Sequence, residues 1–119
     1  YYQLLGVKVG LLAPGSAELE VEVSNQHINP LGAVHGGLYM SLVDAAMGNA
    51  IRSLGIKAVT VDCTTSMISG ASIGEVIKAR GTLEKVGKNL IFASAQVTAG
   101  EKILASSRGT FYRVGVIDY

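Results

Sequence analysis

Asp44 is the residue whose surroundings most strongly indicate a chemical role. Its neighbours in the sequence are apolar, namely Leu42, Val43, Ala45, Ala46 and Met47. A carboxylate in such surroundings loses hydration unless it is paired or takes part in a reaction, and groups with perturbed ionisation gather at functional sites. We therefore expect Asp44 to be a catalytic carboxylate. The alternative is an aspartate that reaches a wet edge of its helix or bonds a neighbouring strand.

A second candidate lies shortly before Asp44, where His35, Gly36 and Gly37 occur at the expected start of a helix. Backbone N–H groups in a first turn have no partner within the helix, and the helix dipole favours negative charge there. Paired glycines let a ligand oxygen approach these groups closely. Such a site could hold the oxyanion of a reacting thioester. The same residues also fit a tight turn with a hydrogen-bonded histidine.

The spacing of these two candidates predicts a site shared by two chains. Gly36 and Asp44 are eight residues apart, which is about 12 Å along one helix. One helix cannot bring both to the same carbonyl group. Two helices packed antiparallel about a two-fold axis near Met40 or Ser41 would place Gly36 of one chain opposite Asp44 of the other. Small residues would allow this close approach: Gly37, Ser41, Ala45 and Gly48.

The elements that must position these residues follow from the pattern of apolar and turn residues. Residues 4–12 and 18–24 read as a β-hairpin, and residues 34–54 as one long helix that ends before Gly55. The helix is apolar nearly all round, so we expect it to be buried. Four β-rich stretches follow, at residues 56–68, 75–86, 90–98 and 102–114, with short connections that favour an antiparallel meander. The predicted fold is α+β, with a curved antiparallel sheet of about five to six strands around one central helix.

Length and composition predict one domain, residues 1–119, that associates with copies of itself. The hydrophobic fraction of 49% is high against 16% charged residues, and some of that apolar surface should face another subunit. The net charge of +1 comes from scattered residues, which argues against nucleic-acid binding.

Other features predict a cytoplasmic protein without a metal. No apolar run is long enough to span a bilayer, and the first residues do not resemble a signal peptide. Because residue 1 is Tyr rather than Met, we expect further residues upstream. Cys63 is the only cysteine, and His27 and His35 are the only histidines, too few for a convincing zinc site.

The run Asn-Pro-Leu-Gly-Ala-Val-His-Gly-Gly at residues 29–37, followed by Leu-Val-Asp ending at Asp44, closely resembles the PaaI-like hotdog thioesterases. The resemblance extends over nearly the whole chain. It implies a hotdog fold and hydrolysis of an acyl-CoA in a homodimer or a tetramer of paired dimers. It also implies that the N–H of Gly36 and the loop residue Asn29 contact the thioester carbonyl.

In the same family the helix aspartate of the partner subunit attacks the carbonyl or activates water, and this residue matches Asp44. His35 would order the loop, and Thr60 would hold the water. The turn Gly87-Lys88-Asn89 resembles the family loop along the pantetheine and phosphates of CoA, so these residues and Gly37 are expected to bind substrate. No cofactor is expected beyond CoA as part of the substrate.

The resemblance is compatible with two classes of acyl group. Aromatic acyl groups such as phenylacetyl or hydroxyphenylacetyl have family precedent, and short or medium aliphatic chains fit equally. Many relatives have a proline in the loop where this chain has Ser69-Gly70-Ala71, so the contacts to the acyl group are not assigned. The alternatives are a non-catalytic acyl-CoA sensor and a hotdog hydratase or dehydratase. Asp62 should face solvent, and Cys63 should be a small buried residue rather than a nucleophile.

Overall fold

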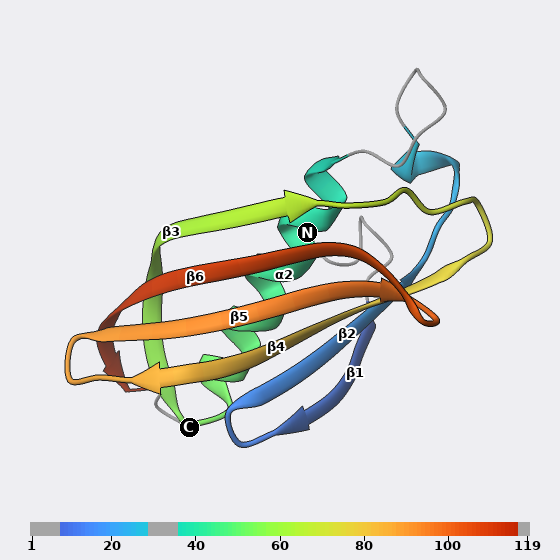
Figure 1. Cartoon of the computed structure of the whole chain (residues 1–119). Coiled ribbons are helices and arrows are strands. Elements are labelled where there is room, and N and C mark those ends of the chain that lie inside the picture. The colour runs from blue at the N-terminus through green and yellow to red at the C-terminus, as the bar shows by residue number, and fades with distance from the viewer. Residues whose placement is uncertain (1–7, 29–35, 117–119) are drawn as a thin grey trace.

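A computed structural model describes residues 8–28 and 36–116 of the chain. Its strands are β1 (Lys8–Ala13), β2 (Ser16–Glu22), β3 (Ile56–Met67), β4 (Val76–Val86), β5 (Leu90–Ala99) and β6 (Lys102–Val116). The helices are the short 3-10 helix η1 (Asn25–His27) and the long helix α2 (Gly36–Arg52). The expected order of hairpin, helix and four strands is confirmed (Figure 1). Within the described residues, no helix is long and apolar enough to cross a membrane.

The six strands form one antiparallel sheet in the order β1-β2-β4-β5-β6-β3. The expectation of a simple meander after the helix is wrong for β3, which pairs with β6 and not with β4. Both edges of β4 are already occupied, by β2 and β5. The chain from Ile68 to Glu75 therefore crosses the end of the sheet, held by backbone hydrogen bonds to Leu104 and to Val23. As a result β3 is an edge strand, and it lies beside α2.

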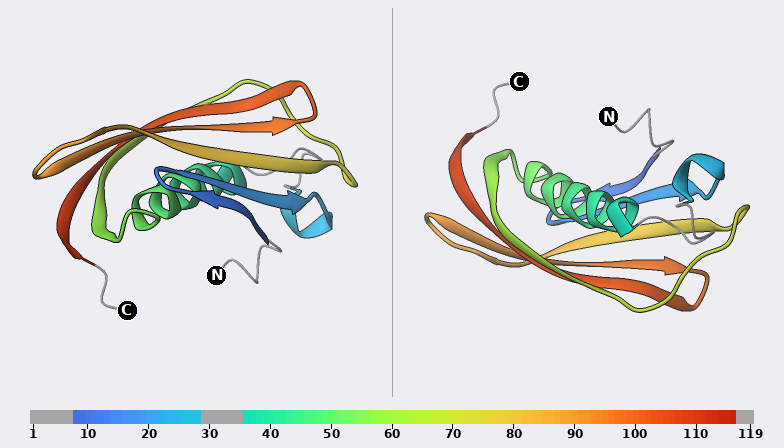
Figure 2. Two further views of the ribbon diagram at one scale, coloured as in Figure 1. Left: turned by 90° about the horizontal axis from the view of Figure 1, so that it is seen from below. Right: turned by 90° about the horizontal axis from the view of Figure 1, so that it is seen from above.

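The sheet curves around α2, which lies in its concave side (Figure 2). Alternate residues of β2 and β5 point inward and are buried, among them Leu19, Val21, Ile91 and Val97. This alternation explains why the two strands keep one face on the core. Buried residues of α2, such as Leu42 and Met47, complete that core.

Two glycines let the helix approach the strands closely. A Cβ atom at Gly81 in β4 would collide with the backbone of Ala46, and a Cβ at Gly109 in β6 would meet the side chain of Met47 at 3.0 Å. The helix axis is thereby fixed in the middle of the sheet. At the other end of α2, Gly55 has a φ of 75°, a conformation that glycine adopts without strain and that ends a helix.

The expectation that α2 is buried nearly all round is wrong for one side. Met40 is 53% exposed, and Asp44 and Arg52 are exposed as well. The helix lies against the sheet with its other residues, so a stripe of its surface next to β3 stays open. That stripe contains the residue for which the sequence predicts the chemistry.

Candidate active site

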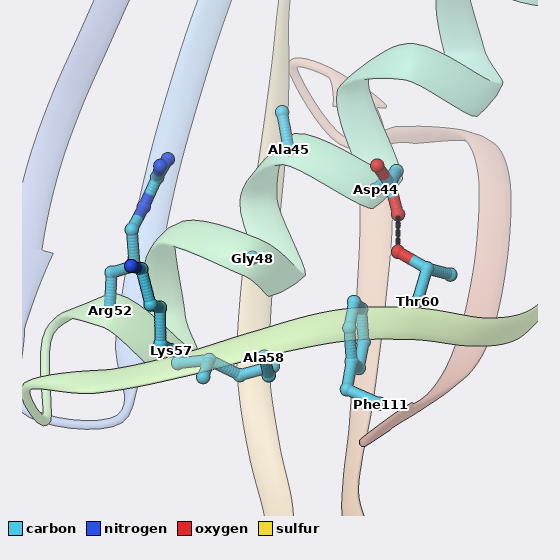
Figure 3. A pocket seen from close by; sticks show the side chains of 9 residues that line it. Asp44, Ala45, Gly48, Arg52, Lys57, Ala58, Thr60 and Phe111 are labelled. Carbon is cyan, nitrogen blue, oxygen red and sulfur yellow. Dashed lines mark hydrogen bonds between the residues drawn. The ribbon is translucent and has the colours of Figure 1, made fainter. Parts of the chain in front are cut away.

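The hydroxyl of Thr60 donates a hydrogen bond of 3.0 Å to Oδ1 of Asp44. Thr60 comes from the edge strand β3 and Asp44 from the middle of α2, so two elements far apart in sequence bring them together (Figure 3). The expectation that the carboxylate is desolvated is wrong for the single chain, because Asp44 is exposed. Asp44 thus lies at the open edge of the helix and bonds a neighbouring strand, an environment that leaves its carboxylate accessible.

A β-bulge in β3 aims Thr60 at the helix. The strand partners shift between Thr60 and Asp62, so that Val61 has no counterpart on β6. Such an extra residue lets side chains three positions apart face the same side of a sheet. Thr60 and Cys63 therefore both face inward, where Cys63 packs against the core. Asp62 points to the outer face.

Asp44 and Thr60 line one end of a pocket of about 410 Å³ between α2 and β3. The pocket extends toward the C-terminal end of the helix, as Figure 3 shows. Its wall combines small or apolar residues with two cationic side chains. The lining residues are Asp44, Ala45, Gly48, Ile51, Arg52, Lys57, Ala58, Thr60 and Phe111.

Gly36 is the first residue of α2, so its N–H has no partner within the helix. A Cβ at this position would lie 3.0 Å from the sulfur of Met67 at the end of β3, which shows that the site around Gly36 is narrow. Gly37, the next residue, is half-buried. Along the same helix Gly36 is still about 12 Å from Asp44. Asn29 and His35, the other residues predicted for this site, lie outside the described residues.

The turn Gly87-Lys88-Asn89 joins β4 to β5, and none of its residues lines the pocket of Asp44. Two hydrogen bonds from Arg113 hold the turn against β6. The backbone N–H of Arg113 donates to the carbonyl oxygen of Asn89 at 2.7 Å. A guanidinium N–H of Arg113 donates to the carbonyl oxygen of Gly87 at 3.4 Å. Arg113 is the strand partner of Ala58, a pocket residue. The turn therefore lies on the far side of β6 from the pocket.

The other chemical candidates lie elsewhere. Asp62 is exposed, as expected, and lines a separate outer-face pocket of about 440 Å³ together with Glu84 and Arg108. Cys63 is half-buried, and its sulfur lies 3.2 Å from the hydroxyl oxygen of Ser107. Among residues 8–28 and 36–116, no group of three or more His, Cys, Asp or Glu could hold a metal ion.

Sequence reasoning missed Arg52 and Lys57, which line the pocket with Asp44. A signal was present in the helix, because Asp44, Gly48 and Arg52 follow one another at intervals of four residues. Such residues share one face of a helix. Lys57 gave no comparable signal, since its place depends on β3 turning back beside the helix.

Several known proteins resemble this chain in sequence over most of its length. A sequence model of the thioesterase superfamily matches residues 31–106. The chain is 36% identical over 102 residues to acyl-coenzyme A thioesterase 13 of Homo sapiens, covering 82% of this chain and 73% of that protein. It is 29% identical over 112 residues to the acyl-coenzyme A thioesterase PaaI of Escherichia coli, covering 93% of this chain and 80% of that one.

Solved structures show the same architecture. The Escherichia coli PaaI structure superposes with a TM-score of 0.92 at 26% identity, over 98% of this chain and 86% of that one. The TT0310 protein of Thermus thermophilus superposes with a TM-score of 0.90 at 30% identity, over 95% and 96% of the two chains. The hotdog fold and the family resemblance predicted from the sequence are both confirmed. This chain belongs to the thioesterase superfamily of thioester hydrolases, in its PaaI-like group.

Proposed function

We propose that this protein hydrolyses acyl-CoA thioesters to a free acid and CoA, with Asp44 as its catalytic carboxylate. One observation carries the proposal: the hydrogen bond of 3.0 Å from Thr60 to Asp44 at the end of an open pocket. An exposed carboxylate in that place can be reached by a substrate and by water. The similarity to acyl-coenzyme A thioesterases supports acyl-CoA as the substrate class.

Two routes fit this arrangement. In the first, Asp44 takes a proton from a water molecule as the water oxygen attacks the thioester carbon. In the second, a carboxylate oxygen of Asp44 attacks the carbon itself, and water then hydrolyses the mixed anhydride. In both routes the C–S bond breaks and the sulfur of CoA leaves as a thiolate that takes up a proton. The Thr60 hydroxyl donates to Asp44, so its lone pairs can accept a hydrogen bond from the reacting water.

The charge that develops on the carbonyl oxygen needs a donor, and we assign this role to the N–H of Gly36 from a second copy of the chain. The loop residue Asn29 would assist, while His35 would order the loop. A preorganised donor of this kind is worth about 3 kcal/mol of barrier. The distance of about 12 Å from Gly36 to Asp44 within one helix is the reason for assigning the two groups to different chains.

The sheet supports association through β3. This strand of 12 residues lies at the edge of the sheet, and an edge of that length is a template for another strand. Val59 and Val61 on β3 are 53% and 57% exposed. A second copy added along this edge would lie directly beside Thr60 and Asp44. On the helix, Ala45, one of the small residues expected at the contact between two chains, is buried in its own chain.

The proposal extends to the acyl group, the residues that bind the substrate, the compartment and the oligomeric state. The acyl group is aromatic, such as phenylacetyl or hydroxyphenylacetyl, or a short to medium aliphatic chain. Gly37, Gly87, Lys88 and Asn89 are assigned to substrate binding, with Lys88 as a point charge toward a phosphate. CoA enters as part of the substrate, and the enzyme acts in the cytoplasm as a dimer or a dimer of dimers.

The test is incubation with a panel of acyl-CoAs that includes phenylacetyl-CoA, 4-hydroxyphenylacetyl-CoA and aliphatic chains of increasing length. Release of free thiol would be followed together with enoyl absorbance. We expect thiol release with at least one class of acyl group and no enoyl signal. If no member of the panel released thiol, the proposed activity would be wrong.

A further inference from the structure

The pocket of Asp44 carries positive charge at its far end. Arg52 stands in the last turn of α2 and Lys57 at the start of β3, and both line the pocket (Figure 3). Asp44 lies at the other end, beside Thr60. A ligand in this pocket would therefore contact a carboxylate at one end and two cations at the other.

No ion pair among the described residues neutralises these two cations. Within the described residues, the ion pairs join Lys78 to Glu18 and Lys102 to Glu75, and neither Arg52 nor Lys57 is part of one. Both side chains are exposed, so their charge is available to a ligand.

Arg52 is also held in place. Its guanidinium donates a hydrogen bond of 2.8 Å to Oδ1 of Asn49, and Nδ2 of Asn49 donates one of 2.8 Å to the carbonyl oxygen of Ala45. The contact to Asn49 uses one of the five N–H donors of the guanidinium. The other donors can bind a planar or tetrahedral anion.

A cation in the last turn of a helix often serves only to complement the helix dipole. That explanation is incomplete here. The carbonyl groups of Asn49, Ile51 and Arg52 already accept hydrogen bonds from Ser53, Leu54 and Gly55. It also leaves Lys57 unexplained, since this residue comes from a strand and lines the same pocket as Arg52.

The spacing of Asp44 and Arg52 along the helix fits the extended form of an acyl-CoA. Asp44 and Arg52 are eight residues apart on α2, or about 12 Å. In acyl-CoA a flexible pantetheine arm separates the thioester from the phosphates, and it can span a distance of this order. Between the two ends the floor is formed by small side chains, Gly48 and Ala58, which leave room for a thin chain.

We propose that Arg52 and Lys57 bind the phosphate groups of the CoA portion, so that the pantetheine arm lies along α2 from Asp44 toward the C-terminal end of the helix. This inference rests on the proposed function. It adds Arg52 and Lys57 to the phosphate contact proposed for Lys88, since CoA carries more than one phosphate group, and it explains recognition of CoA rather than of the acyl group. A thioester without phosphates would lose these contacts.

The experiment compares two thioesters that carry the same acyl group, phenylacetyl-CoA and S-phenylacetyl-pantetheine. If the enzyme hydrolyses another acyl-CoA of the panel faster, that acyl group is used in both thioesters. The variants are Arg52→Met, Lys57→Met and the double variant. Lys78→Met is the matched control, because it removes the same charge from an exposed lysine on β4 outside the pocket. The melting temperature of each variant is compared with that of the wild type to check that the fold is intact.

We expect the double variant to lower the ratio of kcat/KM for the CoA substrate to that for the pantetheine substrate by at least about tenfold, mostly through KM. The Lys78→Met ratio should equal that of the wild type. Added salt should raise the wild-type KM for phenylacetyl-CoA more than that of the double variant. An unchanged ratio, or equal losses on both substrates, would overturn the assignment.

Binding of free CoA separates this proposal from the proposed function. If the wild type binds CoA in calorimetry and the double variant binds it at least about tenfold more weakly, the phosphate site stands even if no thioester is hydrolysed. If both proteins bind CoA equally, or the wild type does not bind it, the phosphate site is wrong whatever the activity.

Discussion

The hydroxyl of Thr60 lies 3.0 Å from Oδ1 of Asp44 and joins the edge strand of the sheet to the middle of the central helix. This contact depends on the bulge at Val61, which turns Thr60 inward. It also places the carboxylate at the open side of the helix and at the end of a pocket. The chemistry of this protein is therefore expected at the junction of α2 and β3.

Replacing Asp44 with Asn keeps the size of the side chain and removes the base or nucleophile. We expect kcat to fall by at least about a hundredfold, with little change in KM or in thermal stability, because Asp44 is exposed. Steady-state kinetics by thiol release measure this. Asp62→Asn is the matched control, since Asp62 is exposed on the opposite face of β3. Equal losses in binding and turnover for Asp44→Asn would argue against the assigned role.

Thr60→Val removes the hydroxyl but keeps a β-branched side chain suited to a strand. We expect about a tenfold loss in kcat, because the hydrogen bond to the carboxylate and an acceptor for the water are both lost. Thr60→Ser restores the hydroxyl and should recover most of the rate. Were valine as active as the wild type, or serine as slow as valine, Thr60 would have no role in positioning.

Gly81→Ala tests how the helix is held over the sheet. The new Cβ would collide with the backbone of Ala46, which cannot move without shifting α2. We expect a loss of roughly 1–3 kcal/mol in the free energy of unfolding, measured by urea denaturation. Gly70→Ala is the control, because no atom lies within 4 Å of its Cβ position. Similar stability of the two variants would mean that the close approach at Gly81 is not needed.

Tyr39 gives a pH-dependent test of the packing at the helix start. Burial raises the pKa of its phenol above 10.0, and the charge of Glu75 adds to this, while a backbone hydrogen bond at Ala71 acts in the opposite direction. The folded state thus favours the neutral phenol. The resulting stability is fully present below the unfolded pKa and is lost as the pH rises through the folded pKa.

Tyr39→Phe should remove this dependence. We expect the free energy of unfolding of the wild type to decline relative to the variant above pH 10.0, and the difference to be constant at lower pH. Urea denaturation at a series of pH values measures it. Parallel profiles for the two proteins across the whole range would show that the phenol is not desolvated in solution.

Much of the fold could be predicted from the sequence, because the elements are marked by local signals. Gly55 ends α2 as the pattern indicated, and the turn at Gly15 lies between β1 and β2. The order of the strands could not be predicted, since it depends on which edges remain free after β2 and β5 have paired with β4. Pairing of β3 with β6 joins residues about fifty positions apart, for example Thr60 and Phe111.

The sequence predicted only the part of the candidate site that a local signal marks. Asp44 stood out by its residue type among apolar neighbours, but its exposure depends on how α2 sits over Gly81 and Gly109. Lys57 could not be recognised, because only the return of β3 beside the helix brings it to the pocket. A local pattern identifies a chemically unusual residue, while its solvent contact and its neighbours are set by tertiary packing.

The central claim is that one active site takes Gly36 from one chain and Asp44 from another. Two inactive variants can test it directly. Asp44→Asn lacks the carboxylate. Gly36→Pro lacks the backbone N–H donor, and proline is tolerated at the first position of a helix. The two proteins would be unfolded together, refolded as a mixture, and compared with each variant refolded alone.

Half of the dimers in an equal mixture are heterodimers, and each of these has one site with both groups intact. The account predicts recovery of about a quarter of the wild-type activity per chain. Native mass spectrometry would establish that heterodimers have formed. If heterodimers are present and the mixture stays as inactive as its components, the two groups do not meet across a subunit boundary and the account is contradicted.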